Sequence, residues 1–143
     1  MCFGSKDNQF GRFHIPPGDG SVGAIKLVHL YGYVSCDTRN SIHWSHWGCA
    51  YHGDIKQKVS IAITTSGNHI LLPASQLASD SALRTTIPGY DSQSPELVLS
   101  FFSNPRPMTS GEELRLWYGE DLANLFEGDN GGRVCCDVYG LII

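Results

Sequence analysis

The chain has 143 residues, of which 41% are hydrophobic and 17% charged, so it can bury a core and is not a disordered chain. Its net charge is −4 and it carries no basic stripe, which excludes phosphate-driven binding of nucleic acids. No apolar run approaches the roughly 20 residues that span a bilayer, so we expect no membrane span.

The predicted elements are short strands separated by turns. The residue patterns predict strands over 10–15, 24–34, 58–64, 69–72, 96–102, 113–118 and 133–141. The strand at 58–64 is expected to be half-buried, residues 74–83 are the one candidate helix, and residues 119–132 are expected to form a loop. No linker or repeat divides the chain, so residues 1–143 are expected to form a single domain. This pattern favours an all-β fold, an antiparallel β-sandwich of jelly-roll type.

Five cysteines constrain the fold further. Cys36 and Cys49 flank a polar, aromatic loop, an arrangement that favours a disulfide across it. Cys135 and Cys136 point to opposite faces of a strand, so one of the two can reach Cys2, and the odd count leaves one thiol free. Five small, buried thiols are the alternative. No CxxC pair exists, so a structural zinc site of the common spacing is absent.

Residues 35–54 break the strand pattern with a long loop rich in histidine and aromatic residues. Long loops of this kind often carry function. Aromatic rings stack on the apolar faces of sugars, and polar side chains bind their hydroxyls, so Trp47 and His46 are candidate sugar contacts. The alternative is that Trp44 and Trp47 anchor the loop on the core while its histidines face solvent.

A metal-dependent hydrolase is a second interpretation of the same loop. His43, His46 and His52 could bind a zinc or copper ion, with Asp54 or Glu120 as the nearby acid. The sequence contains no HExxH motif and no GxSxG elbow. We therefore expect a binding protein and not an enzyme.

An acidic segment precedes the last predicted strand. Glu120, Asp121, Glu127, Asp129 and Asn130 fall within eleven residues, followed by two glycines. Carboxylates this close repel one another unless a cation or solvent screens them. Calcium takes six to eight oxygen ligands from carboxylates, amides and carbonyls, so the segment predicts a calcium site. A solvated acidic loop is the alternative.

The order strand, Asp, loop, Asp-Asn-Gly, strand resembles the end of the calcium-dependent, galactose-binding lectins of the bacterial galactophilic type. Residues 32–36, Trp47-Gly48 and His52-Gly53-Asp54 resemble an upstream segment of the same family. The resemblance implies a β-sandwich of that lectin type, with sugar contacts from His52 and Asp54. It also implies a set of calcium ligands: the Cys36 carbonyl, Asp121, the Asn124 carbonyl, Asp129 and Asn130.

Residues 113–122 and 129–139 also resemble domains of cnidarian skeletal-matrix proteins. That resemblance implies a secreted, extracellular protein, and it leaves an adhesion module with structural calcium as an alternative function. A cytoplasmic protein is the alternative for the compartment, because residues 1–11 lack the pattern of a signal peptide. Calcium-dependent binding of a carbohydrate ligand is the main prediction. Because lectins gain strength from multivalency, we expect a homo-oligomer.

Overall fold

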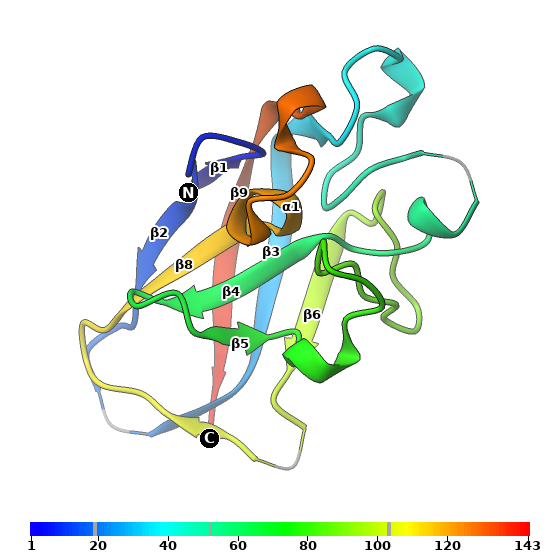
Figure 1. Cartoon of the computed structure of the whole chain (residues 1–143). Helices are drawn as coiled ribbons and strands as arrows, with labels where there is room; N and C mark the ends of the chain where they lie inside the picture. The colour runs from blue at the N-terminus through cyan, green and yellow to red at the C-terminus, as the bar shows by residue number, and fades with distance from the viewer. Residues whose placement is uncertain (19, 52, 103) are drawn as a thin grey trace.

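Two antiparallel β-sheets pack face to face in the computed structural model, which describes residues 1–18, 20–51, 53–102 and 104–143 (Figure 1). The predicted antiparallel β-sandwich is therefore confirmed. The first sheet has the order β1 (Cys2–Gly4), β9 (Gly131–Ile142), β3 (Ser21–Ser35) and β6 (Glu96–Ser100), with β7 (Arg106–Pro107) also paired with β3. The second sheet has the order β2 (Gly11–His14), β8 (Glu113–Tyr118), β4 (Ile61–Thr65) and β5 (Ile70–Leu72).

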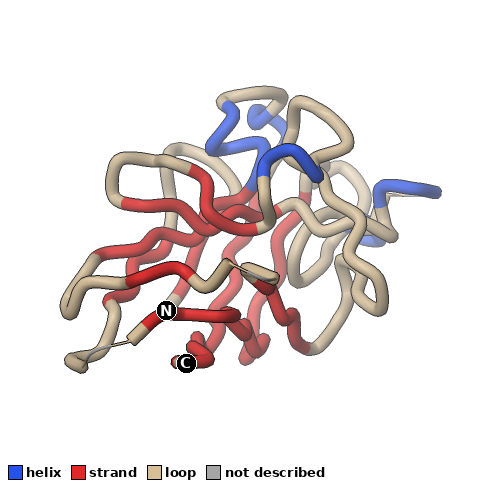
Figure 2. Tube along the Cα trace, turned by 90° about the horizontal axis from the view of Figure 1, so that it is seen from below, coloured by secondary structure: helices blue, strands red, loops and turns tan. Residues whose placement is uncertain are grey.

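The helical segments are short and lie around the strands, as the blue tubes in Figure 2 show. They are α1 (Gly119–Ala123) and the 3₁₀ turns η1 (Ser41–His43), η2 (Gly53–Ile55), η3 (Ser75–Leu77) and η4 (Glu127–Asp129). Within the described part of the chain, no helix is long and apolar enough to cross a membrane.

The helix predicted over 74–83 is wrong, because only η3 forms there. Ala78 is already extended, with φ −64° and ψ 133°, and it makes an isolated bridge with Thr85. The α-helix lies instead at α1, inside the segment predicted as a loop. A short helix of this kind leaves no periodic signal in the sequence, since it makes little more than one turn.

The core fills the space between the two sheets. Leu27 from β3 and Leu114 and Leu116 from β8 are fully buried, as the alternation predicts for residues that face the other sheet. Trp47, from the long loop, is also fully buried and belongs to the same cluster. Each such side chain contributes roughly 1.5–3 kcal/mol by leaving water.

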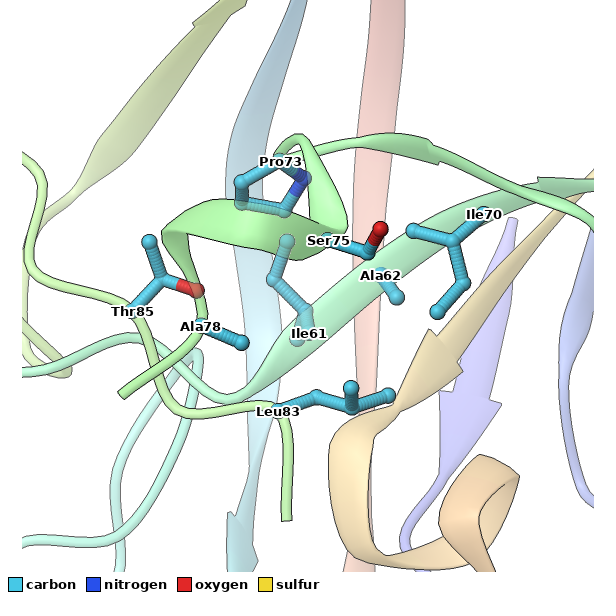
Figure 3. Close-up of a pocket in the computed structure, with 8 residues that line it drawn as sticks. All are labelled: Ile61, Ala62, Ile70, Pro73, Ser75, Ala78, Leu83 and Thr85. Carbon is cyan, nitrogen blue, oxygen red and sulfur yellow. The ribbon is translucent and has the colours of Figure 1, made fainter. Parts of the chain in front are cut away.

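The strand predicted over 58–64 is buried on both faces, not on one. Ala62 and Thr64, predicted to face solvent, are 1% and 0% exposed. Residues 73–85 cover this face, and Figure 3 shows Leu83 and its neighbours gathered around β4. The cavity left between them has a volume of about 10 Å³, which is too small for any ligand larger than water.

Two disulfides form, and both were anticipated in outline. Cys36 pairs with Cys49, with their Cα atoms 5.4 Å apart. Cys2 pairs with Cys135, which settles the choice between Cys135 and its neighbour and fastens β1 to β9. Cys136 is the free, buried thiol.

Candidate functional site

An open cleft of about 320 Å³ lies at the end of the sandwich where β8 ends and β9 begins. Two segments form it, and Figure 1 shows them at the same end of the molecule. We call residues 36–55 the loop wall and residues 119–130 the acidic wall. The lining residues combine charged and aromatic side chains: Cys36, Asp37, Arg39, Tyr51, Ile55, Arg84, Glu120, Phe126 and Asp129.

A charged network holds the loop wall together. The Arg39 Nε and Nη2 atoms donate to the two carboxylate oxygens of Asp37 at 2.8 and 3.0 Å. The Arg39 backbone N–H donates to the same carboxylate at 3.1 Å, and His43 Nδ1 lies 3.5 Å from it. The hydrogen bond from Arg39 lowers the pKa of Asp37 to about 2. Asp37 therefore stays ionised and fixes the loop.

Trp47 anchors the loop wall on the core. Its side chain is 0% exposed, it stacks on Phe3 with ring centroids 6.4 Å apart, and its Nε1 donates to the Ser94 carbonyl at 2.8 Å. A sugar in solution cannot reach such a ring. The prediction of Trp47 as a sugar contact is therefore wrong, and the anchoring role that was its alternative is what the structure shows.

The other predicted sugar contacts of this loop are spread out. His46 is half-buried, stacks on His29 at 3.6 Å, and donates from Nδ1 to the Ser94 carbonyl, so it does not line the cleft. Burial lowers the pKa of His46. Asp54 is exposed on η2, beside the cleft residue Ile55. His52 lies outside the described residues.

The acidic wall contains a carboxylate that is almost completely buried. Glu120 is 3% exposed, and its Oε2 lies 3.5 Å from Nη2 of Arg84, while its Oε1 has no hydrogen-bond partner. Burial raises the pKa of Glu120 to about 7, against the opposing effects of Arg84 and of a side-chain hydrogen bond with Asn130. The burial cost is thus only partly compensated inside the chain.

Asp121 is the next residue of the same helix and does not line the cleft. Its two oxygens accept the backbone N–H groups of Asn8 and Gln9 at 3.0 and 3.1 Å. Burial raises the pKa of Asp121 to about 6, although these two donors act in the opposite direction. The Glu127 carboxyl raises the pKa further, and its own Oε2 is buried without a partner.

Asn130 ends the acidic wall just before β9. Its side chain is 2% exposed, and Nδ2 donates to the Ser5 carbonyl at 2.8 Å. Its Oδ1 is buried without a partner. The neighbouring Asp129 is exposed, and its carbonyl accepts the Thr38 N–H at 3.0 Å, which ties the acidic wall to the loop wall.

The predicted calcium ligands therefore lie around one end of the molecule but not at one point. Cys36 and Asp129 line the cleft, Asp121 and Asn130 are buried behind it, and Asn124 is exposed in the turn that ends α1. Within the described ranges, no three His, Cys, Asp or Glu side chains converge to hold a metal ion.

Phe126 is one of several cleft residues that sequence reasoning missed, together with Asp37, Arg39 and Ile55. Its ring is 76% exposed, and its backbone has φ 55° in the left-handed region. A bulky residue rarely adopts this conformation, which costs on the order of 1–3 kcal/mol and is typical of functional sites. The only signal in the sequence was an apolar residue inside an acidic, glycine-containing loop. Arg84 was missed as well, because it reaches the cleft from a distant segment.

The histidines proposed for a hydrolase have different neighbours. His43 contacts Asp37 and packs on Tyr51 with ring centroids 4.6 Å apart. His46 stacks on His29 instead. The structure thus gives no support to a shared metal ion held by this pair.

A β-sandwich with a polar cleft at its loop end, containing an exposed aromatic ring, has the form of a ligand-binding module. A comparison with solved structures identifies the class as the lectins. AJLec, a lectin from the sea anemone Anthopleura japonica, aligns with a TM-score of 0.86 and 34% sequence identity, covering 99% of this chain and 92% of that one. This chain belongs to the AJLec family of lectins, and it is therefore a binding protein and not an enzyme. Comparisons with protein-family models and with curated proteins gave no match.

Proposed function

We propose that the cleft between the loop wall and the acidic wall binds a carbohydrate, of the galactose type that the resemblance to galactose-binding lectins implies. The observation that carries this proposal is Phe126, an exposed ring held in a costly backbone conformation at the edge of a polar cleft. Membership of a lectin family supports the same conclusion.

The cleft supplies both kinds of contact that a sugar requires. The Phe126 ring can stack on the apolar C–H face of a pyranose, as aromatic rings do with flat apolar surfaces. Asp129 and Arg39 offer an acceptor and a donor for the hydroxyls. Asp54 and His52 remain proposed contacts, and Asp54 is exposed beside the cleft.

We propose calcium as the ion that completes the acidic wall. Among the buried side-chain atoms without a hydrogen-bond partner in the described residues, three are oxygens of this wall: Glu120 Oε1, Glu127 Oε2 and Asn130 Oδ1. Buried acceptors without donors are costly, and oxygen is the ligand that calcium prefers. The residues therefore fit a hard cation. Calcium accepts amide and carbonyl oxygens too, so a convergence of three carboxylates is not required.

The predicted calcium ligands remain proposals: Asp121, Asp129 and Asn130, with the carbonyls of Cys36 and Asn124. They do not meet at one point in this structure, so the unpartnered oxygens of Glu120, Glu127 and Asn130 are what supports a cation at this wall. When bound, calcium would supply a Lewis-acidic centre that orders the wall and attracts sugar hydroxyls. The disulfides are consistent with a secreted, extracellular protein, and we propose a homo-oligomer.

Calorimetric titration of galactose into the protein tests the proposal. One titration is made in the presence of calcium and one in the presence of a chelator. We expect binding in calcium and loss of binding in the chelator. Calcium should also raise the melting midpoint. At a hundredfold excess over its dissociation constant, it should add about 2.7 kcal/mol to the free energy of unfolding. Asp129→Asn should reduce both effects, whereas Asp137→Asn, an exposed acid of β9 outside the cleft, should leave them unchanged.

The possible results separate the candidate functions. Galactose binding that persists in the chelator would contradict the proposed calcium dependence but would support carbohydrate binding. Stabilisation by calcium with no binding to any sugar in a monosaccharide panel would support the adhesion module instead. If substitution of Phe126 left galactose binding unchanged, the assignment of this cleft as the sugar-binding site would be wrong.

A further inference from the structure

Strand β6 is the last strand of the first sheet, and its outer edge is open. Figure 1 shows it beside β3, and of the described strands only β3 pairs with it. The two chain ends lie at β9, where Met1 bonds to Cys136 and Ile143 bonds to Ser21. A strand that extended either end would lengthen β1 or β9, and β3 separates both of these from β6.

Backbone hydrogen-bonding groups of β6 point out of this edge. Pro95 and Phe101, at the two ends of the strand, form backbone hydrogen bonds to β3. Because the direction of these groups alternates along a strand, the odd-numbered residues of β6 face β3, whereas Glu96, Val98 and Ser100 face outward. Within the described ranges, the outward N–H and C=O groups of these three residues have no backbone partner.

An apolar groove runs along the same edge. Its volume is about 320 Å³, within the roughly 300–1,000 Å³ of ligand pockets. Val98, Leu99 and Ser100 all line it, although successive residues of a strand point to opposite faces of the sheet. Three consecutive residues can share a groove only where it lies along the edge of their strand. The far wall comes from β5, η3 and residues 85–90, and none of the described lining residues is charged.

The groove reaches from the surface to the core. Leu72 and Leu99 line it, although they are only 2% and 3% exposed and belong to the core cluster. Leu77 and Phe102 also line it and are 49% and 75% exposed. An apolar side chain inserted here would contact core residues and would be flanked by two exposed apolar side chains. Removal of that apolar surface from water would favour its binding.

We propose that β6 binds an extended peptide segment of another protein as an added antiparallel strand, with apolar side chains at alternate positions of the peptide. Peptide residues opposite Glu96, Val98 and Ser100 exchange hydrogen bonds with the open edge. Those opposite Leu97 and Leu99 point to the same side as these two buried residues, into the groove. A small apolar molecule would fill the groove but leave the backbone groups unpaired, whereas a peptide strand uses both features.

This peptide site is separate from the proposed carbohydrate site. The groove along β6 and the cleft between the two walls share no lining residue. The groove also lacks the charged side chains that line the cleft. The same chain can therefore hold a glycan at its loop end and a polypeptide at the edge of its first sheet, and each interaction can be tested without the other.

Fluorescence anisotropy with a labelled peptide, Lys-Thr-Val-Thr-Val-Thr-Lys, tests the proposal without sugar or calcium. We expect saturable binding, with the threonines opposite the outward-facing residues of β6 and the valines in the groove. N-methylation of the three threonine amides should weaken binding at least about tenfold, because it removes the donors that face β6. N-methylation of the two valine amides, which point away from β6, should weaken it much less. No binding at about 1 mM peptide, or equal weakening by both modifications, would overturn the proposal.

Substitutions in the protein locate the site. Val98→Pro should abolish peptide binding, because it removes an outward N–H but no hydrogen bond to β3. Leu77→Lys should also weaken binding, since it places a charge in the apolar groove, whereas Leu30→Lys, equally exposed on β3 but outside the groove, should not. If Val98→Pro lowers the melting midpoint, the two lysine variants decide the question. Peptide binding that is equal in Leu77→Lys and Leu30→Lys would contradict the proposed site.

Discussion

The two walls of the cleft solve the problem of buried polar groups in opposite ways. In the loop wall, Asp37 is bound by Arg39 and the Trp47 N–H by a carbonyl, and no described side chain of this wall is buried with an unpartnered nitrogen or oxygen. In the acidic wall, Glu120, Glu127 and Asn130 each bury an oxygen without a partner. The first wall pairs its buried polar groups within the chain, whereas the second keeps buried oxygens that the described residues do not pair.

The pKa values of the carboxyl groups differ between the two walls in the same way. The Arg39 guanidinium lowers the pKa of Asp37 to about 2, whereas burial raises the pKa of Glu120 to about 7 and that of Asp121 to about 6. The first carboxylate stabilises the fold when it is charged, and the other two destabilise it when they are charged. This arrangement suits binding, because the hydrogen bonds of the loop wall are already formed before a ligand reaches the acidic wall.

The largest expected effect is on the loop wall. Trp47→Ala should lower the free energy of unfolding by about 3–5 kcal/mol, because it leaves a large cavity in the core and removes one of the two hydrogen bonds to the Ser94 carbonyl. Urea unfolding measures this change. Trp44→Ala, at a half-buried position of the same loop, should cost less. Loss of sugar binding from Trp47→Ala at full stability would mean that the ring contacts ligand after all.

The second effect is a pH dependence from the acidic wall. An acid whose pKa is raised on folding is stabilising only while protonated, so stability should fall as pH rises from about 4.5, the ordinary value of Glu120, to about 7. Glu120→Gln should remove about 1–2 kcal/mol of this fall, after allowance for solvent screening at the cleft. Melting midpoints between pH 4 and 8, with calcium chelated, measure it.

Asp37 provides the control with the opposite sign. Its pKa is lowered on folding, so its contribution is present above about 3.8 and is lost as pH falls toward about 2. Asp37→Asn should therefore lower the melting midpoint at pH 7 and differ less from the parent at pH 2. If both variants changed stability over the same pH range, the contrast between the walls would fail.

The smallest effect on stability is expected at Phe126. Phe126→Ala should weaken galactose binding about threefold to tenfold, the range expected for loss of one aromatic contact, and leave the melting midpoint nearly unchanged. Calorimetry measures the affinity. Phe102→Ala is a matched control, because that ring is 75% exposed and also has a positive φ, 54°, but lies outside the cleft. An equal loss of affinity in both variants would exclude a specific contact.

The sequence predicted those parts of the fold in which local pattern and burial agree. The strand expected at 113–118 matches β8, and the last strand differs from β9 by two residues at its start and one at its end. The helix expected at 74–83 failed because the segment is used as a cover for β4, and packing against a distant strand overrides a weak local preference.

The candidate site was predicted as two polar loops, but not as individual contacts. The choice of Trp47 failed because composition does not tell whether an aromatic ring faces a ligand or the core. Phe126 was missed because its role depends on a positive φ, which no sequence pattern predicts. Arg84 was missed because only the tertiary fold brings it to the cleft. Loop residues acquire their positions from the scaffold, so their sequence alone says little about convergence.

Strand β9 carries both the start of the cleft and the Cys2–Cys135 disulfide. Asn130 ends the acidic wall one residue before β9 begins, and Cys135 is the fifth residue of the strand. The bridge holds β1 beside β9, and the segment that follows β1 supplies the Asn8 and Gln9 N–H groups that bind Asp121. Reduction of this single bond would therefore loosen the acidic wall together with the N-terminal segment, which makes an oxidising environment a condition for an ordered cleft.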